Sequence, residues 1–167
     1  APDGTAHVNI AELPEPARGV QPVELATHHI DAPFAFLRHK TTRRAHYDAF
    51  APQGTAFDTL LWNDAGEVTE FTRGNVIIER ASGELVTPAL ACGLLDGVGR
   101  ARELASGHVK EAVVRVDELA SARRIWFVNS LRGRIPVQLT QVALMSSLRI
   151  SSGNSAMSRA TVSAITE

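Results

Sequence analysis

Short runs of alternating apolar residues, separated by turn-forming residues, fill the middle of this 167-residue chain and limit its fold more than any other feature. This alternation is typical of half-buried β-strands. Glycine-containing turns between such runs favour hairpins, in which neighbouring strands are antiparallel. The expected strands comprise residues 57–62, 67–71, 75–79 and 84–87, and the expected turns comprise residues 63–66 and 82–83.

Helix signals flank this region of hairpins. Thr41 or Thr42 is a suitable N-cap for a helix that continues through Phe50, because a side-chain oxygen can accept a hydrogen bond from a free backbone N–H. Residues 97–106 predict a second helix, which Gly107 would end. Further strands are expected at residues 20–25, 111–116, 124–128 and 134–139, and a helical turn is expected at residues 117–122.

The composition predicts one globular domain. A hydrophobic content of 44% supplies a core, and a net charge of −1 gives no global attraction to nucleic acid or to anionic lipid. No apolar stretch approaches the roughly 20 residues of a membrane helix, and Cys92 alone allows no internal disulfide, which is compatible with a cytoplasmic protein. We expect a linker at residues 1–19, the domain at residues 20–139 and an irregular serine-rich tail at residues 140–167.

The chain has two lysines, which shortens the search for an amine nucleophile. Lys110 lies beside a carboxylate in an expected surface connection. Lys40 follows an apolar run, and Arg38, Arg43 and Arg44 lie close to it in the sequence, so cationic neighbours favour its neutral, nucleophilic form. These residues alone leave open the reading of Lys40 as an ordinary surface lysine.

The segment around Lys40 resembles the lysine segment of class IV pyridoxal-phosphate enzymes. Residues 36–43 read Phe-Leu-Arg-His-Lys-Thr-Thr-Arg, and residues 58–70 resemble the family's strand, turn and strand that end in a glutamate, with Asn75 five residues later. The resemblance implies that Lys40 holds pyridoxal 5'-phosphate covalently and that Glu70 and Asn75 contact the cofactor. Glu70 would bond the pyridine nitrogen and keep it protonated, so that the ring can accept electrons from a breaking substrate bond.

Residues 83–90 and 93–100 are similar to the family's phosphate-binding stretch. Backbone N–H groups at the start of a helix form an anion site, so Val98 and Gly99 are expected to bind the cofactor phosphate. Two positions depart from the family: Asp96 stands where a proline is usual, and Gly99 stands where a threonine hydroxyl commonly holds the phosphate. Both departures predict weaker binding of the phosphate.

Residues 128–136 resemble the loop that returns to the cofactor near the end of the family's domain. Asn129 and Ser130 are expected to contact the cofactor, and Arg132 could pair with a substrate carboxylate. The sequence Asn-Ser-Leu-Arg-Gly at residues 129–133 is most similar to that of the lyase-like domains fused to aminodeoxychorismate synthase, which prepare p-aminobenzoate for folate.

The resemblance implies an α+β fold, a pseudo-barrel of mainly antiparallel strands flanked by helices. The implied function is that of an aminodeoxychorismate lyase, which acts on a small amino substrate and releases pyruvate. Class IV enzymes also have a small N-terminal domain, for which the residues before Val20 leave no room, so that domain or a synthase component is an expected partner. Members of the family are usually dimers, which makes a homodimer an expectation.

Three alternatives remain beside the lyase. The same residues suit a class IV aminotransferase, and a domain without catalysis could serve as an assembly module for a synthase. The histidines at residues 28–46 include no recognised metal-ligand motif, so no metal site is expected. The arginine pairs are interleaved with acidic residues, so a nucleic-acid surface is not expected either.

Overall fold

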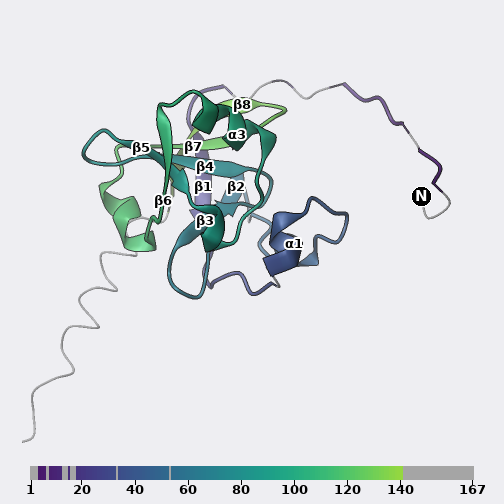
Figure 1. Cartoon of the computed structure of the whole chain (residues 1–167), viewed down its shortest axis with the longest axis horizontal. Coiled ribbons are helices and arrows are strands. Elements are labelled where there is room, and N and C mark those ends of the chain that lie inside the picture. The colour runs from purple at the N-terminus through teal and green to yellow at the C-terminus, as the bar shows by residue number, and fades with distance from the viewer. Residues whose placement is uncertain are drawn as a thin grey trace, which may run out of the picture.

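The computed structural model describes residues 4–6, 8–12, 15, 18–32, 34–52 and 54–140, and these form a curled mixed sheet with short helices around it (Figure 1). The eight strands are in the order β3-β2-β1-β8-β7-β4-β5-β6. The strands are β1 (Gln21–Leu25), β2 (Asp58–Trp62), β3 (Val68–Phe71), β4 (Asn75–Glu79), β5 (Leu85–Pro88), β6 (Val109–Ala112), β7 (Arg124–Asn129) and β8 (Gly133–Leu139). The helices are α1 (Phe34–Arg38), α2 (Ala45–Asp48), α3 (Val98–Ala105) and the 3₁₀ turns η1 (Leu90–Cys92) and η2 (Val116–Ser121).

Antiparallel and parallel pairs alternate in blocks across this sheet. β1 pairs in parallel with both β2 and β8, and β5 pairs in parallel with β6, whereas the other four neighbouring pairs are antiparallel. The chain after β6 then returns to the opposite edge of the sheet: Val68 N–H donates to Val114 O, and Val116 N–H donates to Gly66 O. These bonds link β3 and the turn before it to the segment that follows β6, so the sheet curls into a partly closed barrel and its exposed edge is shortened.

The barrel interior is filled by the inward side chains of alternate strand positions. Val76 and Ile78 of β4 point into the main core, and Ile77 between them belongs to a separate cluster outside the barrel. Phe71 and Phe127 pack within the interior with their ring centroids 5.5 Å apart. This two-residue alternation is what a curved sheet with a covered outer face requires.

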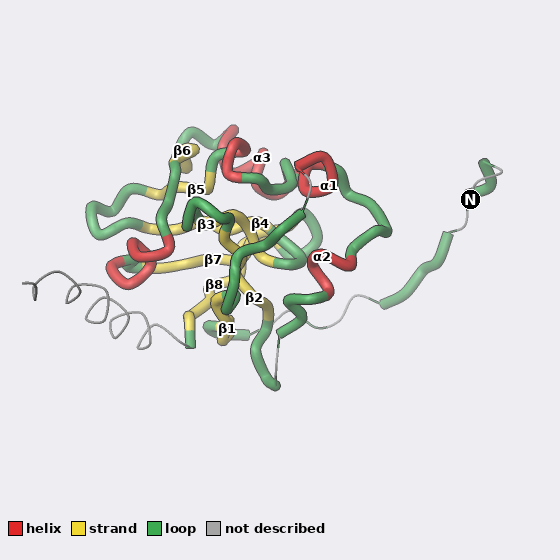
Figure 2. The backbone as a smooth tube through the Cα atoms, turned by 90° about the horizontal axis from the view of Figure 1, so that it is seen from below, coloured by secondary structure: helices red, strands yellow, loops and turns green. Residues whose placement is uncertain are grey.

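Two small layers cover parts of the outer face. Tyr47, Phe50 and Leu37 pack against Leu61 of β2, so the segment that contains α1 and α2 is fixed to that strand. Leu104 of α3 packs on the outer face with Val109 and Val128. Figure 2 shows α1 and α2 on the same side of the sheet.

The expected fold class is confirmed, with corrections to individual elements. Residues 111–116 were expected to be one strand, but β6 ends at Ala112 and Arg115 makes only an isolated bridge to Glu67. Neither Thr41 nor Thr42 caps α2, which begins at Ala45 without a side-chain cap, because the Thr41 hydroxyl instead accepts a hydrogen bond from Arg43 N–H.

Other expected elements have the predicted type with shifted ends. The expected helix at residues 97–106 is α3, and Gly107 follows it at a φ of +75°. No helix within the described residues is long and apolar enough to cross a membrane. The expected serine-rich tail, apart from Thr140, lies outside the described residues, and the division into linker, domain and tail stays a prediction.

Candidate active site

A cavity of about 650 Å³ lies on the outer face of the barrel, between the α1–α2 segment, the ends of β3 and β7 and the start of α3. It brings together seven of the eight residues that the sequence singled out. Arg132 does not contribute to the lining. The seven are Lys40, Glu70, Asn75, Val98, Gly99, Asn129 and Ser130.

Glu70 is the buried acid at the base of this cavity. It is the third residue of β3, and its side chain points to the outer face because Phe71 points inward. The residue is 4% exposed. Its Oε1 accepts a hydrogen bond of 2.7 Å from the Tyr47 hydroxyl and one of 3.1 Å from Leu95 N–H. The carboxyl group therefore has a defined orientation before any ligand is considered.

Burial determines the ionisation of Glu70. Desolvation raises the pKa of this carboxyl to about 8, although the hydrogen bonds from Tyr47 and Leu95 and the charges of Arg44 and Arg100 lower it. A carboxyl that is protonated near neutrality, inside a cavity, is a typical feature of functional sites. It can share its proton with a basic ring nitrogen.

Asn75 connects Glu70 to the loop before α3. Its Nδ2 donates to Leu95 O at 2.8 Å and approaches Glu70 Oε2 at 3.4 Å. Gly97 packs so closely on this side chain that an added Cβ would lie 2.2 Å from Asn75 Oδ1. The spacing of Glu70 and Asn75 thus reflects a shared contact with residues 95–97.

The first turn of α3 meets the end of β7 at close range. Gly99 is buried, and a Cβ built on it would lie 2.7 Å from the carbonyl carbon of Asn129. A threonine therefore does not fit at this position without a shift of the backbone. Gly99, which lacks the hydroxyl expected from the family, allows the start of α3 to contact the turn after β7. Val98 beside it is exposed and lines the cavity.

Asp96 is paired rather than free. Its Oδ1 accepts a hydrogen bond of 3.1 Å from Nη1 of Arg100, whose guanidinium also bonds Pro88 O and Glu111. Arg100 is 1% exposed, so a buried cation lies directly under the start of α3. Arg100 pairs with Glu111 as well as with Asp96, so one cation faces two carboxylates, and the expected repulsion between Asp96 and a phosphate stays a prediction.

The turn after β7 closes the cavity. Asn129 Oδ1 accepts hydrogen bonds from the backbone N–H groups of Leu131 and Arg132, at 3.1 and 2.8 Å. The Asn129 side chain therefore shapes the turn, and Ser130 lies exposed at the cavity. Arg132 contributes its backbone to this turn and lies outside the cavity lining.

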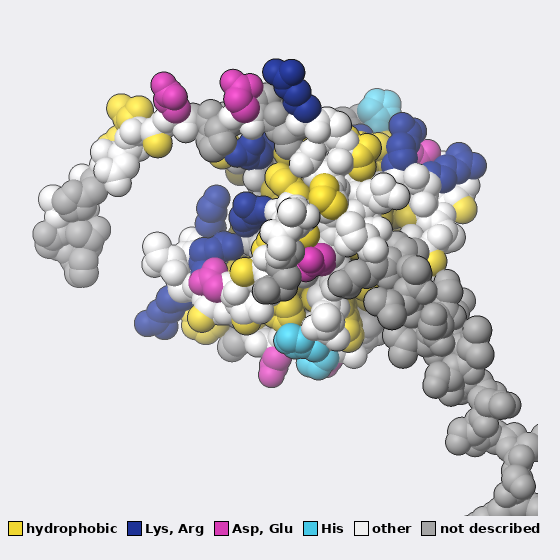
Figure 3. Space-filling model, turned by 180° about the vertical axis from the view of Figure 1, so that it is seen from behind, with side chains coloured by type: hydrophobic (Ala, Val, Ile, Leu, Met, Phe, Trp, Pro, Cys, Tyr) yellow, Lys and Arg dark blue, Asp and Glu magenta, His cyan; other side chains and the backbone are white. Residues whose placement is uncertain are grey.

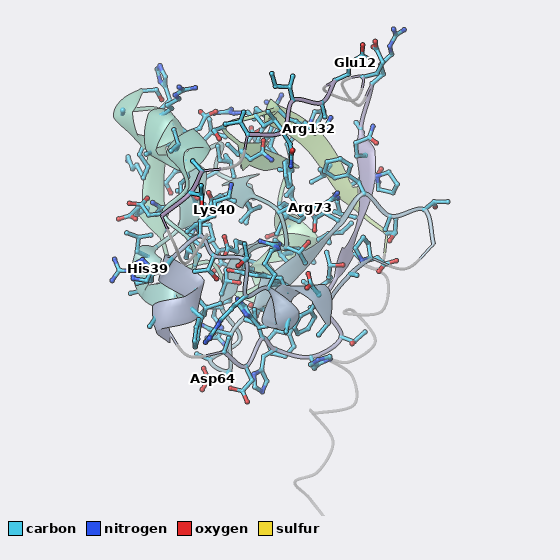
Figure 4. All side chains as sticks on the ribbon, turned by 90° about the vertical axis from the view of Figure 1, so that its right-hand side faces the viewer. Glu12, His39, Lys40, Asp64, Arg73 and Arg132 are labelled. Carbon is cyan, nitrogen blue, oxygen red and sulfur yellow. The ribbon has the colours of Figure 1, made fainter. Side chains whose placement is uncertain are left out.

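Lys40 lies in the loop between α1 and α2, on the wall opposite β3 and β4. It is exposed and lines the cavity together with Arg43 and Arg44. Figure 4 looks onto this side of the molecule, with Lys40 and Arg73 labelled on either side of the view. Lys40 and Glu70 therefore line the same cavity.

The lining of the cavity has a cationic excess. Among the described residues, its charged groups are Lys40, Arg43, Arg44 and Arg73 against Asp48, Glu70 and Asp96. Arg73 stands on the turn between β3 and β4, where its Nε is 3.1 Å from the buried Asp58. The space-filling view of the rear face shows a group of Lys and Arg side chains at the left and others at the top and upper right (Figure 3). Such a lining favours an anionic ligand.

The donor set fits pyridoxal phosphate. A primary amine lies on one wall, a buried carboxyl group that can meet a ring nitrogen lies at the base, and the N-terminus of α3 offers backbone N–H groups to a phosphate. The cavity volume of about 650 Å³ lies within the range of small-molecule sites.

Sequence reasoning missed several residues that build this site. Tyr47 was assigned only to a helix, Arg44 only to the neighbourhood of Lys40, and Arg100 to no role at all. Tyr47 is the single tyrosine of the chain and lies seven positions after Lys40. This proximity in the sequence was the signal that could have pointed to Tyr47. The burial of Arg100 had no signal in the sequence, because arginines are ordinarily exposed.

Comparison with known proteins places the chain among relatives that are longer than itself. It is 36% identical over 102 residues to a Schizosaccharomyces pombe protein assigned as an aminodeoxychorismate lyase, which covers 56% of this chain and 44% of the relative. A Mesorhizobium loti structure assigned as an amino-acid aminotransferase is 40% identical with a TM-score of 0.70, over 75% of this chain and 63% of the other. A Legionella pneumophila structure assigned as a 4-amino-4-deoxychorismate lyase has a TM-score of 0.68 at 20% identity, over 82% and 57%, and supports the fold alone.

The sequence matches the family described as Amino-transferase class IV over residues 1–139. This match covers most of the chain and contains every candidate site residue. The chain spans less than two thirds of the length of the relatives named above. The chain belongs to the class IV aminotransferase family, whose enzymes depend on pyridoxal phosphate.

Proposed function

We propose that this chain provides the cofactor-binding part of an aminodeoxychorismate lyase. The observation that carries the proposal is that Lys40, the buried Glu70 and the start of α3 line the same cavity. The lyase assignment of a relative that is 36% identical supports the choice of reaction.

Each wall of the cavity has a separate role in this proposal. Lys40 bonds the cofactor covalently, releases it to the amino group of the substrate and then moves protons. Glu70 and Asn75 hold the pyridine end, and the cofactor, when bound, supplies a ring that accepts the electrons of the breaking substrate bond. The backbone of Val98 and Gly99, with Asn129 and Ser130, holds the phosphate end.

The substrate of the proposed reaction is 4-amino-4-deoxychorismate. The bond between the ring carbon and the side-chain oxygen breaks, the side chain leaves as pyruvate, and loss of a ring proton makes the product p-aminobenzoate aromatic. Arg43 and Arg73 at the cavity are better placed than Arg132 to meet the carboxylates of this substrate, because Arg132 does not line the cavity. A homodimer, or the remaining part of a longer chain, would cover the open side.

Incubation of the chain and cofactor with 4-amino-4-deoxychorismate tests the proposal. The expected products are pyruvate, measured with lactate dehydrogenase, and p-aminobenzoate, measured by its fluorescence, in equal amounts. Lys40→Arg is the matched control, because it keeps the charge but cannot bond the cofactor, and it should yield neither product. Failure of the unaltered chain to release pyruvate, both alone and with a small N-terminal domain of a class IV enzyme attached, would reject the lyase assignment.

A class IV aminotransferase is the second candidate, and the Mesorhizobium loti relative, 40% identical, favours it. The same residues would then move a proton between two carbon atoms of the substrate–cofactor pair. An amino-acid donor with a 2-oxo acid acceptor distinguishes the two reactions, because only a transferase converts the acceptor into an amino acid.

A further inference from the structure

Tyr47 reaches Glu70 from the opposite wall of the cavity. Its hydroxyl donates to Glu70 Oε1 at 2.7 Å, across 23 positions of the sequence. Tyr47 is 8% exposed and Glu70 is 4% exposed, so water competes little for either group. A hydrogen bond between buried groups is stronger and more directional than one in water.

The two oxygens of Glu70 have different surroundings. Oε1 accepts both the Tyr47 hydroxyl and Leu95 N–H, which occupy its acceptor positions. Among the described residues, Oε2 has only the 3.4 Å approach of Asn75 Nδ2 as a hydrogen-bond contact, and this distance is long for a hydrogen bond. Oε2 is therefore the oxygen that remains available to a ligand.

We propose that Tyr47 is a positioning residue whose hydroxyl holds Oε1 of Glu70, so that Oε2 faces the ring nitrogen of the cofactor and the carboxyl keeps a proton affinity suited to that nitrogen. This inference rests on the proposed function, because a pyridoxal ring gives Oε2 its partner. The neighbour on the other side of Tyr47 supports the arrangement: the guanidinium of Arg44 lies 4.9 Å from the tyrosine ring centroid and donates to Thr72 O.

Charged groups from several elements act on the pair. Arg44 precedes α2 and Arg100 belongs to α3, and both charges lower the pKa of Glu70, while burial raises it. Burial also raises the pKa of Tyr47, and the charge and hydrogen bond of Glu70 raise it further. The other ionisable side chains that line the cavity are His39, Lys40, Arg43, His46, Asp48, Arg73 and Asp96.

Titration of Glu70 tests the proposal without cofactor. In ¹³C NMR of the full chain labelled in its glutamate carboxyls, the Glu70 signal is identified by its loss in Glu70→Gln. Its midpoint should move upward by about one pH unit in Tyr47→Phe, because a hydrogen bond that favours the carboxylate is lost. Thr87→Val is the matched control, since Thr87 also has a buried hydroxyl, bonded to Val76 O at 2.7 Å, outside the cavity. An unchanged midpoint in Tyr47→Phe, or an equal shift in Thr87→Val, would overturn the proposal.

The ionisation of Tyr47 gives a second test, in which Tyr47 itself is not substituted. The chain has one tyrosine, so the alkaline absorbance change near 295 nm reports Tyr47 alone. In Glu70→Gln this change should begin at a lower pH than in the unaltered chain, because the charge and hydrogen bond of Glu70 no longer oppose ionisation. Identical titrations of the two proteins would reject the contact between Tyr47 and Glu70.

With cofactor added, a double-mutant comparison separates this inference from the proposed function. Tyr47→Phe should lower kcat by about tenfold with little change in KM, and the same change in a Glu70→Gln background should have almost no further effect. Additive effects in the two backgrounds would overturn the positioning role. If the unaltered chain neither binds cofactor nor turns over substrate, the proposed function fails, and the two cofactor-free titrations still decide whether Tyr47 controls Glu70.

Discussion

The inward side of β3 and β4 carries Phe71, Val76 and Ile78, whereas the outward side of the same strands carries Glu70 and Asn75. The inward side chains fill the barrel and make no polar contacts. The outward pair is equally buried but is held by hydrogen bonds to Tyr47 and to the loop before α3. The alternation of side chains along a strand thus allows one pair of strands to support a dry core and a polar site at the same time.

Loss of a large inward side chain should have the greatest effect on stability. Phe127 is 1% exposed and contacts the rings of both Phe57 and Phe71. Phe127→Ala should lower the free energy of unfolding by about 3–5 kcal/mol, because it leaves a cavity in the core. Urea unfolding followed by circular dichroism measures this loss. A loss under about 1 kcal/mol would mean that the barrel interior is not the main source of stability.

Loss of the outward carboxyl should instead affect turnover. Glu70→Ala should keep the covalent bond between cofactor and lysine but lower turnover about 100-fold, because the ring nitrogen loses its carboxylate partner. Steady-state kinetics of the loaded protein measure the effect. Glu103→Ala is the control. Glu103 belongs to α3 and pairs with Arg134 of β8 outside the cavity, so its loss should leave turnover unchanged.

The outward face should also make stability depend on pH. The pKa of Glu70 is raised to about 8 in the folded chain, above the ordinary value of 4.5. Between these two values the folded state holds a proton that the unfolded state releases, so the free energy of unfolding should fall as pH rises, by up to about 1.4 kcal/mol per pH unit. This contribution should be complete below pH 4.5 and lost above pH 8.

Chemical denaturation at a series of pH values, with Glu70→Gln as the reference, isolates this contribution. Glu84→Gln is a suitable control, because Glu84 pairs at the surface with Arg80 and Lys110. Parallel pH profiles for the unaltered chain and Glu70→Gln would mean that Glu70 titrates as an ordinary exposed acid.

The smallest expected effect comes from the contact between α3 and the turn after β7. Gly99→Ala places a Cβ 2.7 Å from the carbonyl carbon of Asn129, so the helix start must move. We expect about a tenfold loss of affinity for pyridoxal phosphate and about 1–3 kcal/mol of stability. Equilibrium dialysis and thermal unfolding measure both, and Ala101→Ser, at an exposed position of the same helix, should change neither. Unchanged affinity in Gly99→Ala would remove this contact from the phosphate site.

Much of the strand pattern could be predicted from the sequence because it depends on local alternation and on turn residues. The resemblance of residues 58–75 to the class IV family also pointed to Glu70 and Asn75, and the structure brings both into one cavity. Residues whose role depends on distant contacts could not be predicted. Tyr47 meets Glu70 only because α2 packs on β2, and Arg100 is buried only because Asp96, Pro88 and Glu111 surround it.

Gly99 shows a different limit. The sequence indicated only that Gly99 lacks the hydroxyl of the threonine that is common at this position in the family. The structure shows a close approach of two backbone segments, which no property of residue 99 alone reveals. Parallel pairing of β1 with β2 and β8 was equally hidden, because it joins segments far apart in the chain.

The most direct test of the central claim is the site at which pyridoxal phosphate attaches. The full chain is titrated with the cofactor, the absorption spectrum is recorded, and borohydride reduction followed by mass mapping locates the modified residue. We predict a new visible band and an adduct on Lys40, with no adduct in Lys40→Ala, although that variant should unfold like the unaltered chain because Lys40 is exposed. An adduct on Lys110 in preference to Lys40, or equal labelling of Lys40→Ala, would contradict it.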